Sequence, residues 1–362
     1  MSVEIAQLRR EQLSELRDFL REAYPDDPRK HDLNFLSWYF LENPNQSADE
    51  VPLWVAIDDG KIVGQLATIL VDLMVGAELT KAIWILEFIL LPKYRGQGLG
   101  KRLVRAAEAR YPTMITLGIN DASTRVFVSL GWKAMGSIHR YHRMLYAGNA
   151  TKELAKNWLL RGIANLASAP LRSGAGKGAM EAGYELRRGG GPGPDWDRLW
   201  ERASKQWTCA VRRSKEFLKW QFEEQPGKKF DFIQLYRGEE LVGYAVLFFR
   251  AGTDGGPPPK AAISDLVYDP DRAEEIIDAL IRAALGEAIA RKAGSLVTDV
   301  LDAKVEARLK KHRFWQVRNA PRFMASSKQF QGAMYREENW HLTRGDADVS
   351  IFEEPNEGAP LR

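Results

Sequence analysis

Residues 92–101 read Pro-Lys-Tyr-Arg-Gly-Gln-Gly-Leu-Gly-Lys and lie between two segments of opposite character. The segment before them, Ala82–Leu91, is almost continuously apolar and predicts a strand that is buried on both faces. The segment after them, Leu99–Arg110, has the spacing of an amphipathic helix. Glycines at alternate positions leave backbone N–H groups open at a helix N-terminus, where the helix dipole also favours an anion. We therefore expect a phosphate-binding loop here.

Two common phosphate loops do not fit this segment. A Walker loop has four residues between its first Gly and a Gly-Lys pair that Ser or Thr follows, but only three residues separate Gly96 from Gly100, and Arg102 follows Lys101. A dinucleotide fingerprint needs Gly at its sixth place, which is Lys101 when counted from Gly96. The loop belongs to another class.

The first 146 residues predict the order strand, two helices, three strands, helix, strand, helix, strand. Pro44 ends the second helix, and Asp59-Gly60 supplies the turn of a hairpin. The predicted strands are Val3–Leu8, Val51–Ile57, Ile62–Val75, Ala82–Leu91, Met114–Gly118 and Trp132–Leu145, and the predicted helices are Glu11–Tyr24, Asn34–Glu42, Leu99–Arg110 and Ala122–Leu130.

The loop and this element order resemble the GNAT superfamily of N-acetyltransferases. Arg95, Gly98 and Gly100 fill the family's loop pattern of Arg or Gln, two residues, Gly, one residue, and Gly or Ala. The resemblance implies an acetyl-CoA co-substrate whose pyrophosphate lies on this loop. The places of the family's later motif hold Asn120, Ala122, Leu130, Gly131 and Trp132. The coenzyme-binding residues implied are Leu90, Arg95, Gly96, Gln97, Gly98, Leu99, Gly100, Lys101 and Asn120.

The chain also repeats itself at a long period. The stretch Phe35–Pro44 recurs as Phe217–Pro226, with Phe, Leu, Trp and Pro at matching places. Later landmarks keep the same order and nearly the same spacing, because Val63-Gly64 corresponds to Val242-Gly243 and Pro92 to Pro270. We therefore expect an α/β protein of two tandem GNAT-like domains, each a mixed, mostly antiparallel sheet flanked by helices. The expected divisions are a GNAT domain at 1–146, a linker at 147–182, a degenerate domain at 183–327 and a C-terminal extension at 328–362.

The second copy has lost the phosphate loop. At the corresponding place, Asp269–Glu275 contains four acids and no glycine, so it should repel a pyrophosphate. We expect one coenzyme site per chain.

The linker contains an amphipathic segment in which Leu154, Trp158, Ile163 and Leu166 share one side, with basic residues beside them. A linker helix docked by its apolar side and a helix lying on a membrane surface both fit this pattern.

Glu87 is the candidate general base, because an acid inside an apolar strand loses hydration and becomes a stronger base. A structural or substrate-binding acid is the alternative, and Asp265, at the matching place of the second copy, suggests an acid that lines a shared cleft. Where the family often has a tyrosine as general acid, this chain has Phe127. Tyr141 and His139, on one face of a predicted strand, are the candidate substitutes, unless the thiolate leaves unassisted.

Two further polar features each have a functional and a structural explanation. Asn120 either contacts the coenzyme or caps the helix that begins near Ala122. Asp346 and Asp348 either receive a cationic substrate or belong to a Gly-centred turn. No His and carboxylate spacing indicates a metal site.

The composition bears on the binding partners and on the cellular compartment. A net charge of +4 on 362 residues, without a dense basic block, gives no indication of nucleic-acid binding. A single cysteine, Cys209, favours a reducing compartment and a buried, inert thiol, and the absence of long apolar runs or a leader predicts a cytoplasmic protein without stable membrane insertion.

We expect an N-acyltransferase that moves acetyl from acetyl-CoA to a primary amine of a small molecule or peptide. The rivals are a non-catalytic coenzyme A-binding scaffold and a Fem-like aminoacyl transferase, which uses charged tRNA. An amino sugar, an amino acid, a peptide N-terminus and a polyamine all remain open as acceptor, and the oligomeric state is not predicted.

Overall fold

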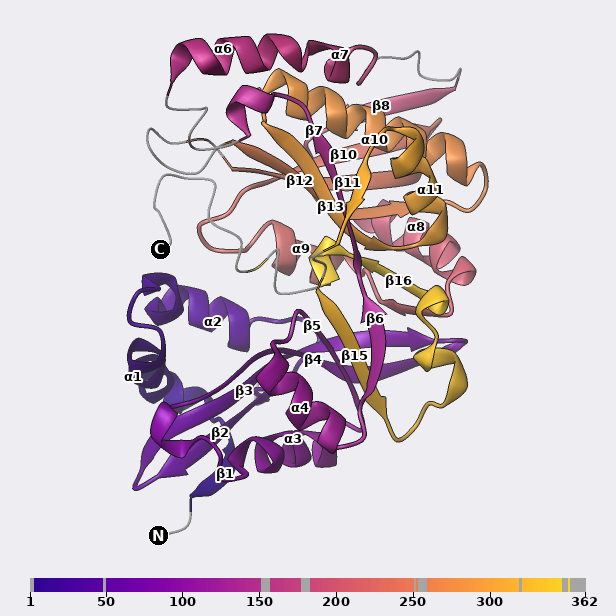
Figure 1. Ribbon diagram of the computed structural model, residues 1–362. Coiled ribbons are helices and arrows are strands. Elements are labelled where there is room, and N and C mark those ends of the chain that lie inside the picture. Colours follow the sequence, from indigo (N-terminus) through magenta and orange to yellow (C-terminus); the bar gives the residue numbers. More distant parts are fainter. Residues whose placement is uncertain are drawn as a thin grey trace.

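A computed structural model describes residues 3–47, 50–150, 157–176, 183–250, 252, 259–318, 321–346 and 351. Figure 1 shows two layers of strands, one above the other, with helices against each. Within the described residues, sixteen strands form one hydrogen-bonded network, in which two larger sheets are recognisable.

The first half of the chain has the predicted element order as far as the helix before residue 130, but two strands follow where one was predicted. Its strands are β1 (Glu4–Gln7), β2 (Leu53–Asp58), β3 (Lys61–Val75), β4 (Glu78–Leu90), β5 (Thr113–Leu117), β6 (Lys133–Ser137) and β7 (His139–Met144). Its helices are α1 (Leu13–Ala23), α2 (Leu33–Leu41), α3 (Leu99–Arg110) and α4 (Asp121–Ser129).

The second half repeats this order. Its strands are β8 (Tyr184–Arg188), β9 (Cys209–Val211), β10 (Phe230–Arg237), β11 (Glu240–Arg250), β12 (Lys260–Tyr268), β13 (Ser295–Leu301), β14 (Trp315–Val317), β15 (Arg322–Ser327) and β16 (Trp340–Thr343). Its helices are α8 (Pro194–Ala203), α9 (Lys215–Phe222), α10 (Ala273–Ala290) and α11 (Ala303–Lys311), and α6 (Trp158–Ala167) and α7 (Ala169–Arg172) lie between the halves in sequence. Among the described strands of the second half, β9 and β16 are the two without a counterpart in the first half.

Strand registers strengthen the prediction of a repeat. Glu87 on β4 pairs with β3 immediately after a bulge at Leu86, and Asp265 on β12 pairs with β11 immediately after a bulge at Ser264. A bulge is a one-residue insertion at a defined place in a ladder. The bulges lie at corresponding positions of the two halves, and this similarity is visible in the structure but not in the sequence.

The two halves exchange their last strands. Strand β15, from the second half, lies between β5 and β6 of the first half and is antiparallel to both. Strand β7, from the first half, lies between β13 and β14 of the second half. In Figure 1, β7 runs in the upper half and β15 in the lower half. The predicted continuous strand Trp132–Leu145 is therefore wrong, because it is two strands, β6 and β7, that belong to different sheets. The strands β14 and β15 likewise belong to different sheets.

Strands β9 and β16 connect the two sheets. β9 is antiparallel to the far end of β3 and parallel to β16, which in turn pairs with β13. Strands β12 and β13 pair only as far as Ile263 and Thr298, and beyond that point β16 takes the place beside β13. The predicted extension at 328–362 thus supplies a strand that lies where β12 and β13 separate.

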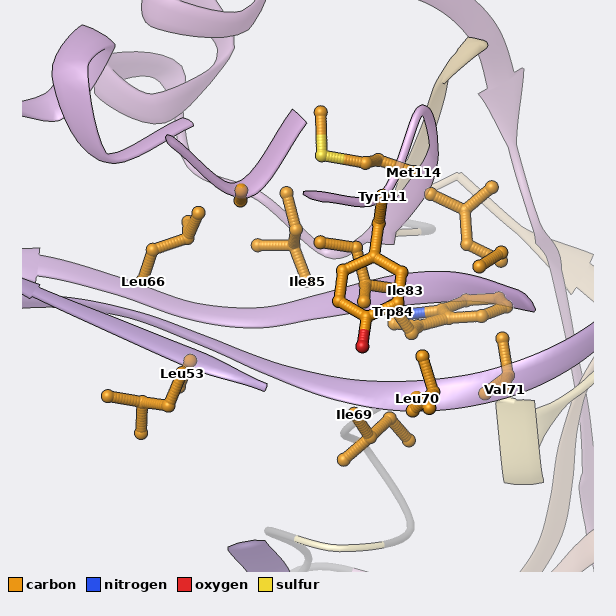
Figure 2. Packing of buried hydrophobic residues seen from close by; sticks show 14 of the residues in the cluster. Leu53, Leu66, Ile69, Leu70, Val71, Ile83, Trp84, Ile85, Tyr111 and Met114 are labelled. Atoms are coloured by element: carbon orange, nitrogen blue, oxygen red, sulfur yellow. The ribbon is translucent and has the colours of Figure 1, made fainter. Parts of the chain in front are cut away.

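A large apolar cluster stabilises the first half. Figure 2 shows side chains of β3, β4 and the start of β5 packed against one another. The predicted burial of both faces is confirmed for Ala82–Ile85 in the middle of β4, whereas Leu86–Leu90 are only partly buried. The labelled members are Leu53, Leu66, Ile69, Leu70, Val71, Ile83, Trp84, Ile85, Tyr111 and Met114.

Two tryptophans at equivalent positions of the repeat join the halves. The ring of Trp38 on α2 stacks on that of Trp220 on α9, with centroids 5.0 Å apart. Each indole N–H donates to the other residue's backbone carbonyl at 2.9 Å. Because the two bonds are reciprocal, the contact has local two-fold symmetry, as expected where two copies of one helix meet.

Candidate active site

The glycine loop adopts a conformation that requires glycine. Gly96 and Gly98 have φ angles of 78° and 77°, a region that other residues enter only at a cost, although a Cβ atom would meet nothing within 4 Å at either position. Gly98 is the N-cap of α3, which begins at Leu99. Both glycines are exposed, so the first N–H groups of a 12-residue helix face an accessible loop.

Side chains of the loop hold its shape and give it positive charge. The Arg95 Nε donates to the carbonyl of Leu90 at 3.0 Å, and the Gln97 amide donates to the carbonyl of Lys93 at 2.9 Å. Lys101 on the first turn of α3 is exposed. The loop therefore combines accessible backbone donors with cations, and this combination fits a pyrophosphate.

Gly100 allows α3 to pack closely against β4. A Cβ atom at Gly100 would lie 2.8 Å from the ring of Phe88. That ring neighbours Phe127 on α4, and Phe127 packs on Trp132 with centroids 4.5 Å apart. Phe127 is fully buried in this cluster. The position where the family often has a tyrosine that acts as general acid is therefore part of the core in this protein.

Strands β4 and β5 separate partway along their length. They pair in parallel from Ile83 and Met114 as far as Ile85 and Thr116, where the Thr116 hydroxyl donates to the Ile85 carbonyl at 3.0 Å. Past this point Leu86–Leu90 are only partly buried. The glycine loop lies at the end of this segment and Glu87 near its beginning.

Glu87 lies within a group of polar side chains from the first half. It forms an ion pair with Lys30, which belongs to the short helix η2 (Pro28–His31), and the two side chains are 9% and 13% exposed. The amide of Gln65 on β3 donates to the other carboxylate oxygen at 3.4 Å. Burial and then the charge of Glu87 raise the pKa of Tyr24, whose ring lies 3.9 Å from the Lys30 ammonium. Sequence reasoning missed Lys30, Tyr24 and Gln65.

Tyr141 and His139 lie on β7, in the sheet of the second half. They share one face of the strand, as predicted, because both contact the carboxylate of Glu306. Tyr141 is fully buried and donates its hydroxyl proton to Glu306 at 2.8 Å, and burial raises its pKa. His139 lies between Glu306 and Glu337. The hydrogen bonds and ion pairs described for Tyr141 and His139 join them to Glu306 and Glu337, not to Glu87 or its neighbours.

Asn120 caps α4. Its side-chain oxygen accepts from the N–H of Ser123 at 2.8 Å, which is the capping role considered from sequence. Coenzyme contact by Asn120 stays a prediction.

In the second half, the corresponding acid is enclosed. Asp265 accepts from the hydroxyls of Tyr244 at 2.9 Å and Thr343 at 2.7 Å, and it pairs with the buried Arg213. Arg213 also pairs with Asp346, so the predicted turn at Asp346 is a buried part of the segment that follows β16. Asp265 therefore does not line a shared cleft. Asp348 and Leu154 lie outside the described residues.

The described ranges contain neither a candidate metal centre nor a candidate membrane-spanning helix. No group of three or more His, Cys, Asp or Glu side chains in these ranges is arranged to hold a metal ion. Nor does any described helix combine the length and apolar character needed to cross a bilayer.

Comparison with known proteins concerns the first half of the chain and the overall fold. Residues 11–132 match the model of the acetyltransferase (GNAT) family, which spans about a third of the chain. No curated protein matches the sequence significantly.

Solved structures share the fold over most of the chain. A GCN5-related N-acetyltransferase from Anabaena variabilis is 14% identical with a TM-score of 0.59, and a probable N-acyltransferase from Enterococcus faecalis is 11% identical with a TM-score of 0.61; each alignment covers 90% of this chain and 72% of the other. Saccharomyces cerevisiae N-myristoyltransferase with bound myristoyl-CoA is 14% identical with a TM-score of 0.56, and the alignment covers 90% of this chain and 82% of that enzyme. At these identities the likeness concerns the fold.

Proposed function

We propose that this protein transfers an acetyl group from acetyl-CoA to a primary amine of a small molecule or peptide. The observation that carries the proposal is the separation of β4 from β5, with the glycine loop at one end and Glu87 at the bulge where it begins. The GNAT family match over the same residues supports acyl transfer. Acetyl is the proposed group, although one structural neighbour carries myristoyl-CoA.

The loop would hold the coenzyme through its backbone. The N–H groups that follow Gly98 and the charges of Arg95 and Lys101 suit the pyrophosphate, while Leu90 and Asn120 stay candidates for the pantetheine arm. The coenzyme itself supplies the activated thioester.

The Lys30–Glu87 ion pair suggests where the acceptor amine would bind. Lys30 presents an ammonium group to the Glu87 carboxylate in a partly buried place, and an acceptor ammonium has the same chemistry. In the proposed reaction the acceptor displaces Lys30, and Glu87 then takes the proton that the amine must lose before attack. The bulged backbone at Leu86 is the candidate donor to the oxyanion.

No side chain is assigned as the acid for the leaving thiolate. Phe127 has no proton to donate, and Tyr141 is buried with its hydroxyl committed to Glu306. We propose that the thiolate leaves unassisted. His139 is held between two carboxylates and is not retained in the proposed mechanism.

The second half would have a non-catalytic role. It lacks the glycine loop, and β16 lies where β12 and β13 separate, so two features oppose coenzyme binding there. We propose a tandem GNAT protein with one acetyl-CoA site per chain. A single buried cysteine is consistent with a cytoplasmic location.

Release of free thiol tests the proposal. Acetyl-, octanoyl- and myristoyl-CoA are each incubated with a panel of amino sugars, amino acids, peptides and polyamines. Amine-dependent thiol release with acetyl-CoA supports the proposal, and a preference for a longer chain would correct the acyl group. Tight binding of acetyl-CoA without turnover of any amine would favour the scaffold alternative.

Glu87→Gln separates catalysis from binding. If Glu87 is the base, kcat falls by a factor of about 10² to 10⁴, while the Kd of acetyl-CoA stays within about twofold. Gln65→Leu is the matched control, because it removes a contact to Glu87 and leaves the carboxylate in place. A loss of kcat below about fivefold for Glu87→Gln at pH 7 would show that the acid is structural.

A further inference from the structure

Helices α6 and α7 expose an unusual apolar face. Among the described residues, six of the ten large exposed hydrophobic side chains lie on these two short helices. Trp158 and Leu166 are each 76% exposed, and no residue of α6 is buried. The exposed members are Trp158, Leu159, Leu160, Ile163, Leu166 and Leu171. A contiguous apolar face of this kind indicates a binding surface.

The polar side of α6 is docked on the protein, which fixes the apolar side outward. The Asn165 side chain accepts from the N–H of Gly148 at 2.8 Å and donates to the side chain of Asn149 at 3.1 Å. The Ser168 hydroxyl accepts from the N–H of Ala147 at 3.2 Å. Gly148 also packs directly against the backbone of α6. The expectation of a helix docked by its apolar side is therefore wrong.

Charge identifies the chemistry of the missing partner. In the sequence, no acidic residue occurs from Leu154 to Met180, between Glu153 and Glu181, whereas Lys156, Arg161, Arg172 and Lys177 are basic. Lys156 and Lys177 lie outside the described residues. Of the other two, Arg161 is exposed, and the Arg172 guanidinium donates to the carbonyls of Leu145 and Asn165. A short helix with Trp and Leu on one side and basic residues nearby is typical of a segment that lies in a membrane interface and favours anionic lipids. An acidic protein surface would satisfy the charges but would not need so large an apolar face.

We propose that the α6–α7 face binds reversibly to the surface of an anionic lipid bilayer. A helix of ten residues spans about 15 Å, so α6 lies along the surface rather than across the bilayer. In Figure 1 α6 and α7 form the upper end of the molecule, and α3 lies at the lower end. The coenzyme loop at the start of α3 thus stays away from the lipid. This inference is independent of the proposed acyl transfer.

Vesicle flotation tests the inference with the full-length protein. The probes are vesicles of pure phosphatidylcholine and vesicles with roughly 30% phosphatidylglycerol, each at low and high salt. We expect binding to the anionic vesicles to exceed binding to the neutral ones by about tenfold or more, and to weaken as salt screens the basic residues.

A matched pair of variants localises the binding. W158S/L166S removes the two most exposed apolar side chains of α6 and should lower the partition coefficient by about 30-fold or more. The control L79S/W315S changes the same residue types at sites that are 53% and 44% exposed on other elements, and should bind within about threefold of wild type. Because all four side chains are exposed, both variants should keep the wild-type unfolding midpoint.

Three results would overturn the proposal. The first is absence of binding to anionic vesicles by the wild type, and the second is equal binding by W158S/L166S. The third is a concentration-dependent dimer, seen by sedimentation without lipid, that W158S/L166S abolishes, because a second copy of the chain would then cover the face.

Discussion

Strand exchange predicts that residues 1–146 do not fold alone. Such a fragment keeps β7, which belongs to the other sheet, and lacks β15, which separates β5 from β6. Phe323 and Met324 of β15 are buried in the first half's core. Burial of two such side chains contributes about 5 kcal/mol, which is comparable with the whole stability of a domain, about 5–15 kcal/mol.

A rearranged chain provides the positive control. Arg322 pairs with Ser137, and the N–H of Ile138 donates to the carbonyl of Pro321 at 3.1 Å, so β6 and β15 already have the geometry of a hairpin. Joining residue 138 to residue 321 through Asn-Gly, and ending the chain at residue 335, should restore the sheet within one half. A Phe323→Asp version of this chain should unfold.

Guanidinium unfolding and calorimetry with acetyl-CoA distinguish the cases. We expect cooperative unfolding and coenzyme binding for the rearranged chain, and neither for residues 1–146. The reasoning is refuted if residues 1–146 unfold cooperatively with a stability within about 1 kcal/mol of the rearranged chain, because β15 would then contribute little.

The remaining predictions concern the loop, the thiol and acid stability. Gly98→Asp should weaken acetyl-CoA binding by about 100-fold through strain and repulsion, whereas Gly76→Asp, at another exposed turn with positive φ, should leave the calorimetric Kd unchanged; two sites per chain would contradict the one-site proposal. Burial raises the pKa of Cys209 to about 12, so iodoacetamide should label it only after unfolding, and rapid native labelling would contradict this. Burial opposes ionisation of Asp278, but hydrogen bonds from Arg308 and a neighbouring histidine lower its pKa to about 2. Its stabilising effect, complete above about pH 4, should be lost towards pH 2, and Asp278→Asn should flatten that part of the stability curve.

Much of the fold could be predicted because its signals are local. The alternate glycines of the loop, the apolar run of β4 and the repeated Trp38 and Trp220 helices each appear within a few residues of sequence. The exchange of β7 and β15 could not be predicted, since the residues of a strand determine which faces are apolar but not which of two similar sheets it joins. In the first half, the point where the chain passes from one sheet to the other is marked only by Ile138, the single residue between β6 and β7.

The site was predicted less completely for a similar reason. Glu87 stands out as an acid within an apolar strand, but Lys30 is one of several basic residues in an ordinary loop. Its place beside Glu87 depends on how α1 packs against β3 and on how the short helix η2 packs against α1 and α2. For α6, periodicity identified the apolar side but did not reveal that the polar side is the one docked on the protein.

Because of the position of β16, the gap between two separating strands is filled by the chain itself in the second half but not in the first. Where β12 and β13 separate, the chain supplies its own occupant, and a covalently attached segment is present at a high effective concentration at all times. The corresponding gap between β4 and β5 has no such occupant from the described chain. If acetyl-CoA binds there as proposed, the stability of this part of the sheet would rise with the concentration of free acetyl-CoA. Without coenzyme, local opening is expected first between β4 and β5, whereas the gap between β12 and β13 stays filled by β16.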